Sequence, residues 1–160
     1  EEMFMANYAD GLTDLPLPKM IEHFRQHDKI ASLVSVKPAR SLHVVSLGGN
    51  GIVKGIQDLT NSGLFVNGGY FLFKREIFDY INEGDELVEQ PFQRLIAKGQ
   101  LISYPCDGFW AAMDTFKEKQ QLEDLYSRGE APWEIWKSET HGNGKGSAAT
   151  MAQLPARSRS

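Results

Sequence analysis

The chain has 160 residues, of which 41% are hydrophobic and 24% charged, as is typical of one globular domain with its own core. Its formal net charge of -4 argues against broad nucleic-acid binding, because no basic surplus is present to displace counterions. The single cysteine, Cys106, rules out an internal disulfide and fits a cytoplasmic location, and no apolar run approaches the roughly 20 residues that a membrane helix requires.

Hydrophobic periodicity predicts strands that alternate with helices. Strands are predicted over residues 3–8, 30–36, 42–47, 52–56, 64–73 and 101–104, and helices over 20–27, 76–81, 89–98 and 115–126. Gly48-Gly49-Asn50-Gly51 is typical of a hairpin turn, and Phe116, Leu122 and Leu125 form the apolar set of the last helix. This order predicts an α/β fold with a mixed sheet, in which ligands bind beyond the carboxyl ends of strands, where Asp10 falls.

The two ends of the chain differ from its middle. The chain opens on Glu1 and enters a strand-like run almost at once, which we interpret as a piece cut from something longer. From Ser138 onward Gly, Ser, Ala and Thr dominate, so residues 138–160 are predicted to be a disordered tail and residues 1–137 a folded domain. The glycines of the tail have the wrong spacing for a phosphate-binding loop.

Two carboxylates stand out because each lies beside small residues at the end of an apolar run. Asp10 belongs to Tyr8-Ala9-Asp10-Gly11, and Asp114 belongs to Gly108-Phe109-Trp110-Ala111-Ala112-Met113-Asp114-Thr115. Two such groups can share one Mg²⁺ ion while triphosphate oxygens fill its remaining positions, which points to chemistry on a nucleotide. The alternative for each is a turn carboxylate or a helix N-cap, since Asp114 precedes a predicted helix.

Asn67-Gly68-Gly69 interrupts a predicted strand. Glycines at such a place mark either a bulge that curves the sheet or a close approach by a ligand, here a sugar bound by Asn67 and exposed amides. The sequence leaves both interpretations open. Trp110 is a candidate wall of a sugar or base site, whereas Trp133 and Trp136 are predicted to pin the end of the domain onto its core.

Other patterns that suggest chemistry lack their required partners. His23 and His27 have the spacing of a zinc pair, but Phe24 stands where a metalloprotease motif requires Glu, and no third ligand is evident. Cys106 has no histidine near it in sequence, and no nucleophile elbow frames a serine. Neither a zinc site nor a covalent nucleophile is therefore expected.

Taken together, these motifs resemble the sugar-1-phosphate nucleotidyltransferases, and in particular the glucose-1-phosphate cytidylyltransferases. The resemblance covers about Met3 to Trp136. It rests on four segments: Tyr8-Ala9-Asp10-Gly11, Phe65-Val66-Asn67-Gly68-Gly69-Tyr70-Phe71, Gly108 through Thr115, and Ala131-Pro132-Trp133-Glu134-Ile135-Trp136. The tryptophan-containing segments are the more specific ones.

The resemblance implies a Rossmann-like mixed sheet flanked by helices and a Mg²⁺-dependent reaction of CTP with glucose 1-phosphate. It implies that Asp10 and Asp114 are the catalytic, metal-binding carboxylates. It also implies a set of substrate-binding residues: Gly11, Asn67, Gly68, Gly69, Tyr70, Glu89 and Trp110. The expected partners are a nucleoside triphosphate and a sugar 1-phosphate, without nucleic acid or membrane, and a homo-oligomer is left open.

Two departures from the family pattern affect these expectations. The glycine-rich loop that cradles the triphosphate and reads the base is absent, so the chain resembles the C-terminal portion of such an enzyme, incomplete at its N-terminus and inactive alone. The stretch Ile56-Gln57-Asp58-Leu59-Thr60 lacks the lysine that contacts the sugar phosphate, which leaves that role to another cation such as Arg75. Transfer of a different base or sugar, or a non-catalytic sugar-phosphate-binding homologue, are the alternatives.

Overall fold

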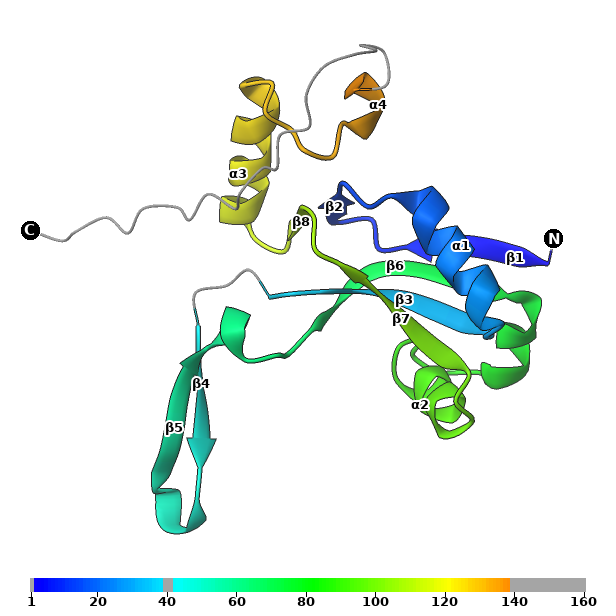
Figure 1. The fold of residues 1–160 in the computed structure, drawn as a ribbon, viewed down its shortest axis with the longest axis horizontal. Coiled ribbons are helices and arrows are strands. Elements are labelled where there is room, and N and C mark those ends of the chain that lie inside the picture. The colour runs from blue at the N-terminus through cyan, green and yellow to red at the C-terminus, as the bar shows by residue number, and fades with distance from the viewer. Residues whose placement is uncertain (1, 39–41, 139–160) are drawn as a thin grey trace, which may run out of the picture.

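The computed structural model of the chain describes residues 2–38 and 42–138. Its centre is a four-stranded sheet in the order β1-β6-β3-β7 (Figure 1). β1 and β3 both run antiparallel to β6, and β7 runs parallel to β3, which confirms the predicted mixed sheet. The four strands are β1 (Met3–Asn7), β3 (Ala31–Val36), β6 (Val66–Lys74) and β7 (Leu101–Cys106).

Helices cover both faces of this sheet because β6 carries large apolar side chains on both sides. Phe71 and Phe73 share one cluster with α2 (Gln90–Ala97) and the 3-10 helix η3 (Arg75–Tyr80). Leu72, between them, belongs to a second cluster with α1 (Leu17–His27), as the two-residue period of a strand requires. The result is a three-layer α/β arrangement with β6 inside it (Figure 1).

A second, smaller sheet lies apart from the first. β2 (Gly11–Thr13) and β8 (Trp110–Ala112) form an antiparallel ladder, which the sequence does not predict because three residues are too few to show a period of two. β8 leads into α3 (Phe116–Ser127), followed by α4 (Ile135–Ser138). Figure 1 shows both helices beyond the small ladder, away from the main sheet.

The apolar residues predicted to anchor this last part of the chain fall into two groups. Leu122 is buried, and the Trp133 ring is half-buried against Phe109, with ring centroids 5.5 Å apart. Phe116 is 79% exposed and Trp136 is 59% exposed, so the prediction that they pack inward is wrong. Phe116 is the first residue of α3, and periodicity alone does not tell whether a packing layer reaches that end.

The predicted hairpin is present and projects from the body of the molecule (Figure 1). β4 (His43–Leu47) pairs with β5 (Val53–Asp58), and the connection includes the single 3-10 turn η1 (Gly49–Gly51). Positive φ angles of 58° at Asn50 and 76° at Gly51 explain the Asn-Gly pair in the turn. A further 3-10 turn, η2 (Leu59–Asn61), follows β5 on the way to β6. Residues 43–58 are called the arm below.

The ends of the described chain give two further results. No helix within residues 2–38 and 42–138 combines the length and apolar character that crossing a bilayer demands. Ser138 is the last residue of α4. The rest of the predicted disordered tail, residues 139–160, lies outside the described residues.

Candidate functional site

The two candidate carboxylates lie at the same end of the β2–β8 ladder. Asp10 directly precedes β2, and its carbonyl oxygen accepts a hydrogen bond of 2.9 Å from the backbone N–H of Met113. Asp114 is the next residue, where the backbone bends toward α3. The pairing of Gly11 with Ala112 fixes this arrangement, so three residue pairs bring the backbones of Asp10 and Asp114 to the same end of the ladder although the two residues are far apart in sequence.

The N-cap of α3 is Thr115 rather than Asp114. The hydroxyl of Thr115 accepts a hydrogen bond of 3.2 Å from the backbone N–H of Glu118 and donates one of 2.9 Å to the Glu118 carboxylate. The Thr115 hydroxyl thereby satisfies a backbone N–H in the first turn of the helix, as an N-cap does. Asp114 is therefore not required to start α3, whereas Asp10 lies in the turn between β1 and β2.

Asn67, Gly68 and Gly69 form a bulge at the start of β6. The pairing of β3 with β6 shifts register between Leu33 and Ser35, opposite this segment, which confirms the bulge interpretation of the glycines. The side-chain oxygen Oδ1 of Asn67 accepts a hydrogen bond of 2.9 Å from the Gly69 backbone N–H, so the asparagine stabilises the bulge itself. The interpretation of Asn67, Gly68 and Gly69 as a sugar site stays a prediction.

Each glycine of the bulge is required by its surroundings. A Cβ on Gly68 would lie 3.2 Å from the side chains of Val34 and Val36. Gly69 has a φ of +74°, and a Cβ there would lie 2.7 Å from the Tyr8 ring. The carbonyl oxygen of Gly69 also accepts a hydrogen bond of 2.8 Å from the Tyr8 backbone N–H. The bulge therefore brings β6 close to the chain that leads from β1 to Asp10.

Two aromatic side chains join the bulge to the small ladder. The indole N–H of Trp110 donates a hydrogen bond of 2.8 Å to the carbonyl oxygen of Gly68. The hydroxyl of Tyr70 donates one of 2.7 Å to the carbonyl oxygen of Gly11, and burial raises the pKa of this tyrosine, which keeps it a neutral donor. Four of the predicted substrate-binding residues are thus in mutual contact beside the ladder that holds Asp10 and Asp114.

Tyr8 belongs to the same cluster, although the sequence assigns it no role. Its ring packs edge-on against Phe71, with centroids 5.4 Å apart, and its outer part is exposed. Burial raises its pKa most, and the negative charges of Glu86 and Asp10 add to the effect. The signal for Tyr8 in the sequence is an aromatic residue between a predicted strand and a candidate metal ligand. The position of the Tyr8 ring over Gly69 could not be predicted, because it depends on the register of β1 against β6.

Glu89 is placed differently from the other predicted substrate-binding residues. It directly precedes α2 and is exposed, and its side chain caps no N–H of that helix. Its backbone N–H donates a hydrogen bond of 3.0 Å to the carbonyl oxygen of Glu86, and Glu86 is the acidic residue whose charge acts on Tyr8. Glu89 therefore belongs to the turn that carries Glu86, and Glu86 is the acidic residue of this turn whose charge reaches Tyr8.

The cation suggested for the sugar phosphate, Arg75, lies at the wrong end of the sheet. It follows Lys74, which pairs with Met3, whereas the Asn67 end of β6 is seven residues away, a span of roughly 23 Å in an extended strand. Lys37 is placed better, because it follows Val36, which pairs with Val66. Its ammonium group lies 3.8 Å from the carboxylate of Asp107. The sequence signal that could have identified Lys37 is its place directly after a predicted strand.

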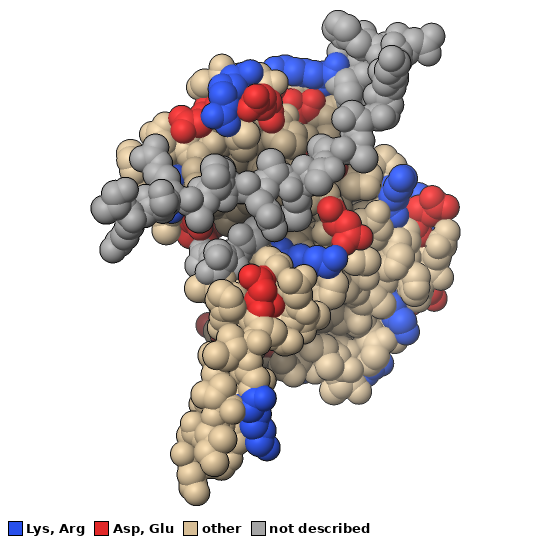
Figure 2. Space-filling model, turned by 60° about the vertical axis from the view of Figure 1, so that its left-hand side comes forward, with Lys and Arg blue, Asp and Glu red and all other residues tan. Residues whose placement is uncertain are grey.

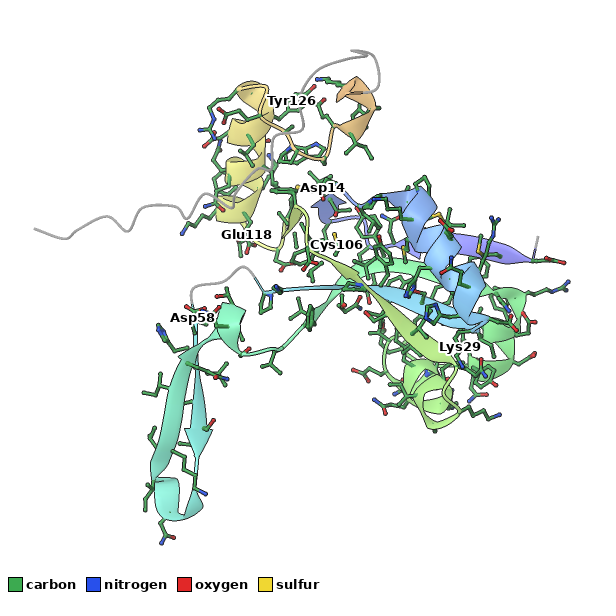
Figure 3. All side chains as sticks on the ribbon, in the orientation of Figure 1. Asp14, Lys29, Asp58, Cys106, Glu118 and Tyr126 are labelled. Atoms are coloured by element: carbon green, nitrogen blue, oxygen red, sulfur yellow. The ribbon has the colours of Figure 1, made fainter. Side chains whose placement is uncertain are left out.

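Asp14 explains why the segment before β8 contains a glycine. Its backbone N–H donates a hydrogen bond of 3.2 Å to the carbonyl oxygen of Phe109, and a Cβ on Gly108 would lie 2.2 Å from the Asp14 carboxylate. One oxygen of this carboxylate is buried without a hydrogen-bond partner among the described residues. Figure 3 shows Asp14 next to β2 and Cys106 where β7 leads toward β8. Asp14 thus holds the segment before β8 in place.

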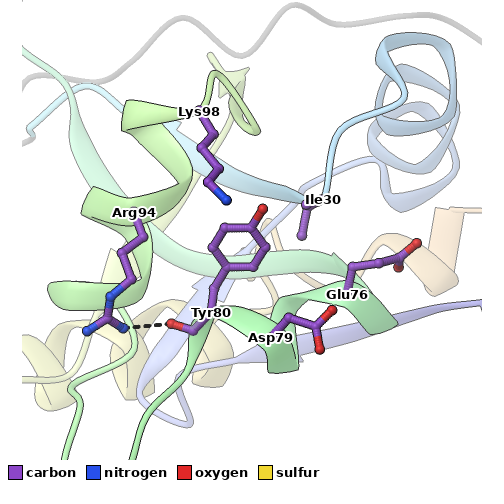
Figure 4. A pocket seen from close by; sticks show the side chains of 6 residues that line it. All are labelled: Ile30, Glu76, Asp79, Tyr80, Arg94 and Lys98. Carbon is purple, nitrogen blue, oxygen red and sulfur yellow. Dashed lines mark hydrogen bonds between the residues drawn. The ribbon is translucent and has the colours of Figure 1, made fainter.

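Two cavities of the described chain differ in their distance from the cluster around Trp110 and the glycine bulge. One of about 450 Å³ lies between α3 and the small ladder, lined in part by Leu12, Met113 and Trp133. Another of about 480 Å³ lies near the far end of β6 (Figure 4). There Arg94 donates a hydrogen bond of 2.7 Å to the Tyr80 carbonyl, and Lys98 lies 5.0 Å from the centre of the Tyr80 ring. The cations of the second cavity are therefore engaged within the chain.

Comparison with known proteins identifies the relatives of this chain. No family model matches it. Over 138 residues it is 31% identical to the glucose-1-phosphate cytidylyltransferase of Salmonella typhimurium, and equally similar to that of Salmonella typhi. Its homologues are glucose-1-phosphate cytidylyltransferases. The match covers 85% of this chain and 53% of each cytidylyltransferase, so the chain spans about half the length of these relatives.

Solved structures agree with the cytidylyltransferase relationship at the level of the fold. A Bacillus anthracis protein assigned as a glucose-1-phosphate thymidylyltransferase, crystallised with sucrose, matches with a TM-score of 0.55 at 15% identity, over 78% of this chain and 54% of that chain. HddC from Yersinia pseudotuberculosis matches with a TM-score of 0.50 at 13% identity, over 79% and 56% of the two chains. The Rossmann-like fold predicted from the sequence is thereby confirmed.

Proposed function

We propose that this chain forms the part of a glucose-1-phosphate cytidylyltransferase that holds the divalent cation and the sugar phosphate. The whole reaction transfers a cytidylyl group from CTP to glucose 1-phosphate and releases CDP-glucose and pyrophosphate. One observation carries the proposal: Asp10 and Asp114 meet at one end of a ladder whose residues Gly11 and Trp110 contact the glycine bulge. The names of the homologues support the reaction class.

The carboxylates fit Mg²⁺ in their number and chemistry. Within residues 2–38 and 42–138, no three His, Cys, Asp or Glu side chains gather closely enough to hold a metal by themselves. Mg²⁺ commonly takes one or two protein carboxylates and completes its shell with substrate phosphates and water. Asp10 and Asp114 would supply the two carboxylates. When bound there, Mg²⁺ would neutralise negative charge on the triphosphate.

The other residues would act by positioning the substrates. A phosphate oxygen of glucose 1-phosphate forms a bond to the α-phosphorus of CTP while the bond to the bridging oxygen of pyrophosphate breaks, so no protein nucleophile is needed. Trp110 and Tyr70 hold Gly68 and Gly11 in contact, which would shape the floor of the sugar site. Lys37, at the same end of the sheet, is the described cation that we assign to the sugar phosphate.

A non-catalytic sugar-phosphate-binding protein is the second candidate. Its favouring observation is the stretch from Ile56 to Thr60, which runs through β5 and η2 without a lysine. Transfer of another base or to another sugar remains a variant of the first candidate, because the cluster described here contacts no base-reading segment.

Activity and binding measured separately would test the proposal. Pyrophosphate release should be measured for the full-length gene product with glucose 1-phosphate, Mg²⁺ and each of the four nucleoside triphosphates. Binding of glucose 1-phosphate to the same protein should be followed by isothermal titration calorimetry. Turnover that prefers CTP supports the proposal, and binding without turnover supports the second candidate. The absence of both binding and turnover would overturn both.

A further inference from the structure

Helix α1 carries two histidines on one side of its C-terminal end. His23 and His27 occupy positions i and i+4, and such side chains are neighbours on a helix surface. Their ring centroids lie 4.2 Å apart, and the ring planes are inclined at 39° to each other. The spacing seen in the sequence therefore becomes a pair of adjacent imidazole rings in the fold.

Each of the two rings keeps a nitrogen atom that the fold does not use. Nδ1 of His27 lies 2.8 Å from the carbonyl oxygen of His23. A carbonyl oxygen only accepts, so Nδ1 of His27 carries the proton and Nε2 keeps a lone pair. A backbone carbonyl is a common second partner of a metal-binding histidine, because it fixes the tautomer and orients the ring. Nδ1 of His23 is buried and has no hydrogen-bond partner among the described residues.

Charge and exposure at the histidine pair suit a metal ion. Burial lowers the pKa of His23, and the neighbouring His27 lowers it further, so the ring is in the neutral form that binds a metal. The C-terminal end of a helix carries the negative end of its dipole, which favours a cation. His27 is exposed, whereas His23 is half-buried against Tyr104 of β7. One ring is therefore fixed by packing, and the other is open to water.

The histidine pair differs from the zinc centre of a metalloprotease. Phe24 stands where that motif requires Glu, and its side chain is buried in the core. Within residues 2–38 and 42–138, no third His, Cys, Asp or Glu side chain joins the two rings. On the face shown in Figure 2, acidic and basic side chains are interspersed rather than gathered into one acidic patch. A bound ion would therefore depend on the two imidazoles and on water.

We propose that His23 and His27 chelate one transition-metal ion of the class of Zn²⁺, Ni²⁺ and Cu²⁺, with water in its remaining positions. Imidazole nitrogen suits these ions, whereas Mg²⁺ prefers oxygen ligands. The site is thus distinct in its metal from the carboxylates Asp10 and Asp114. Because His27 is the last residue of α1, the ion joins the end of this helix to the preceding turn and stabilises it.

Isothermal titration calorimetry with Ni²⁺ tests this proposal on the purified chain, prepared without a polyhistidine tag. Excess Mg²⁺ in the buffer competes for carboxylate ligands. One Ni²⁺ should bind per chain, and His27→Gln should weaken the binding by about ten-fold or more, because a single imidazole loses the chelate. The matched control His43→Gln removes an imidazole from the arm and should bind as the unchanged chain does. No binding by the unchanged chain, or equal losses in the two variants, overturns the proposal.

A second variant separates the spacing of the histidines from their number. Arg25→His/His27→Gln keeps four histidines in the chain but places the pair on α1 at positions i and i+2, which do not face each other. This variant should bind Ni²⁺ as weakly as His27→Gln. The melting temperature should rise with Ni²⁺ in the unchanged chain and stay constant in both variants, whose melting temperatures without metal show that they fold. Retained Ni²⁺ binding by the double variant would assign the ion to other ligands and refute the proposal.

Discussion

Gly69 shows how one backbone conformation shapes the candidate site. Its positive φ turns the start of β6 toward β1, and the Tyr8 ring occupies the space where a side chain would begin. The residue therefore meets two separate demands, one on the backbone and one on space. Glycine satisfies both, which gives a physical reason for the Asn-Gly-Gly motif in addition to any ligand.

We expect Gly69→Ala to destabilise the fold by about 2 kcal/mol, from the strain of a positive φ and from the clash with Tyr8. Urea unfolding, followed by circular dichroism, measures the change. Gly84→Ala is the matched control, since Gly84 has a φ of +82° and no atom within 4 Å of its Cβ position. It should lose about 1 kcal/mol, from backbone strain alone. Equal losses at the two sites would show that Tyr8 does not constrain Gly69.

Asp114 carries the prediction about catalysis. In the full-length protein Asp114→Asn should lower pyrophosphate release by about 100-fold or more, because an amide is a much poorer ligand for Mg²⁺ than a carboxylate. The melting temperature should hold, since Thr115 rather than Asp114 caps α3. Asp79→Asn, near the far end of β6, removes a charge elsewhere and should leave turnover within a factor of two. Near-normal turnover of Asp114→Asn would remove its assigned role.

At the scale of elements, α2 and α3 differ in how far they enter the core. Phe92 of α2 is buried against both Phe71 and Phe73, with ring centroids 5.8 Å and 6.3 Å away. Phe116 begins α3 and is 79% exposed. The same residue type therefore has opposite environments in these two helices.

We expect Phe92→Ala to cost about 3–5 kcal/mol in the free energy of unfolding, because it leaves a cavity against the rings of Phe71 and Phe73. Phe116→Ala should stay within about 0.5 kcal/mol of the unchanged chain. Chemical denaturation of both variants under one buffer condition makes the comparison. Similar losses for both would mean that Phe116 is covered in solution, by a partner or by residues outside the described part of the chain.

The elements differ in how well the sequence predicts them. β3, β6 and α2 are long enough to show their period, and their predicted ranges agree with the structure to within two residues at each end. β2 and β8 have three residues each, and their pairing joins segments almost a hundred residues apart, so no local pattern marks them. The segment predicted as a short helix over residues 76–81 is the 3-10 helix η3.

The candidate site was predictable in its residues but not in its geometry. Motifs alone selected Asp10, Asp114 and the glycines. The roles of Tyr8 and Lys37 depend on the register of β1 and β3 against β6, which no local pattern fixes. Arg75 illustrates the same limit. It is close to the Asn67 bulge in sequence, but the extended strand β6 separates the two in space.

The pH dependence of stability is a property of the whole molecule, and His23 contributes to it. His23 is half-buried on α1, and its ring lies edge-on to Tyr104, with centroids 5.4 Å apart. Burial lowers the pKa of His23, and the neighbouring His27 lowers it further. The His23 imidazole therefore takes up a proton near pH 6.5 in the unfolded chain, whereas in the folded chain it does so only at lower pH.

Stability should accordingly fall as the pH drops below about 6.5, because the unfolded state then binds more protons. We expect His23→Gln to reduce the loss of melting temperature between about pH 7 and pH 5. Differential scanning calorimetry at several pH values measures this slope. An unchanged slope for His23→Gln would place the acid sensitivity in other groups.

The short ladder between β2 and β8 also governs how the two carboxylates respond when the rest of the molecule deforms. Their separation is set by neighbouring backbone hydrogen bonds rather than by the stacking of the four large strands. A fluctuation of the main sheet, or a longer arm in the chain between Asp10 and Asp114, would move these two residues together. Insertions in that long intervening stretch would therefore leave the relative placement of Asp10 and Asp114 unchanged.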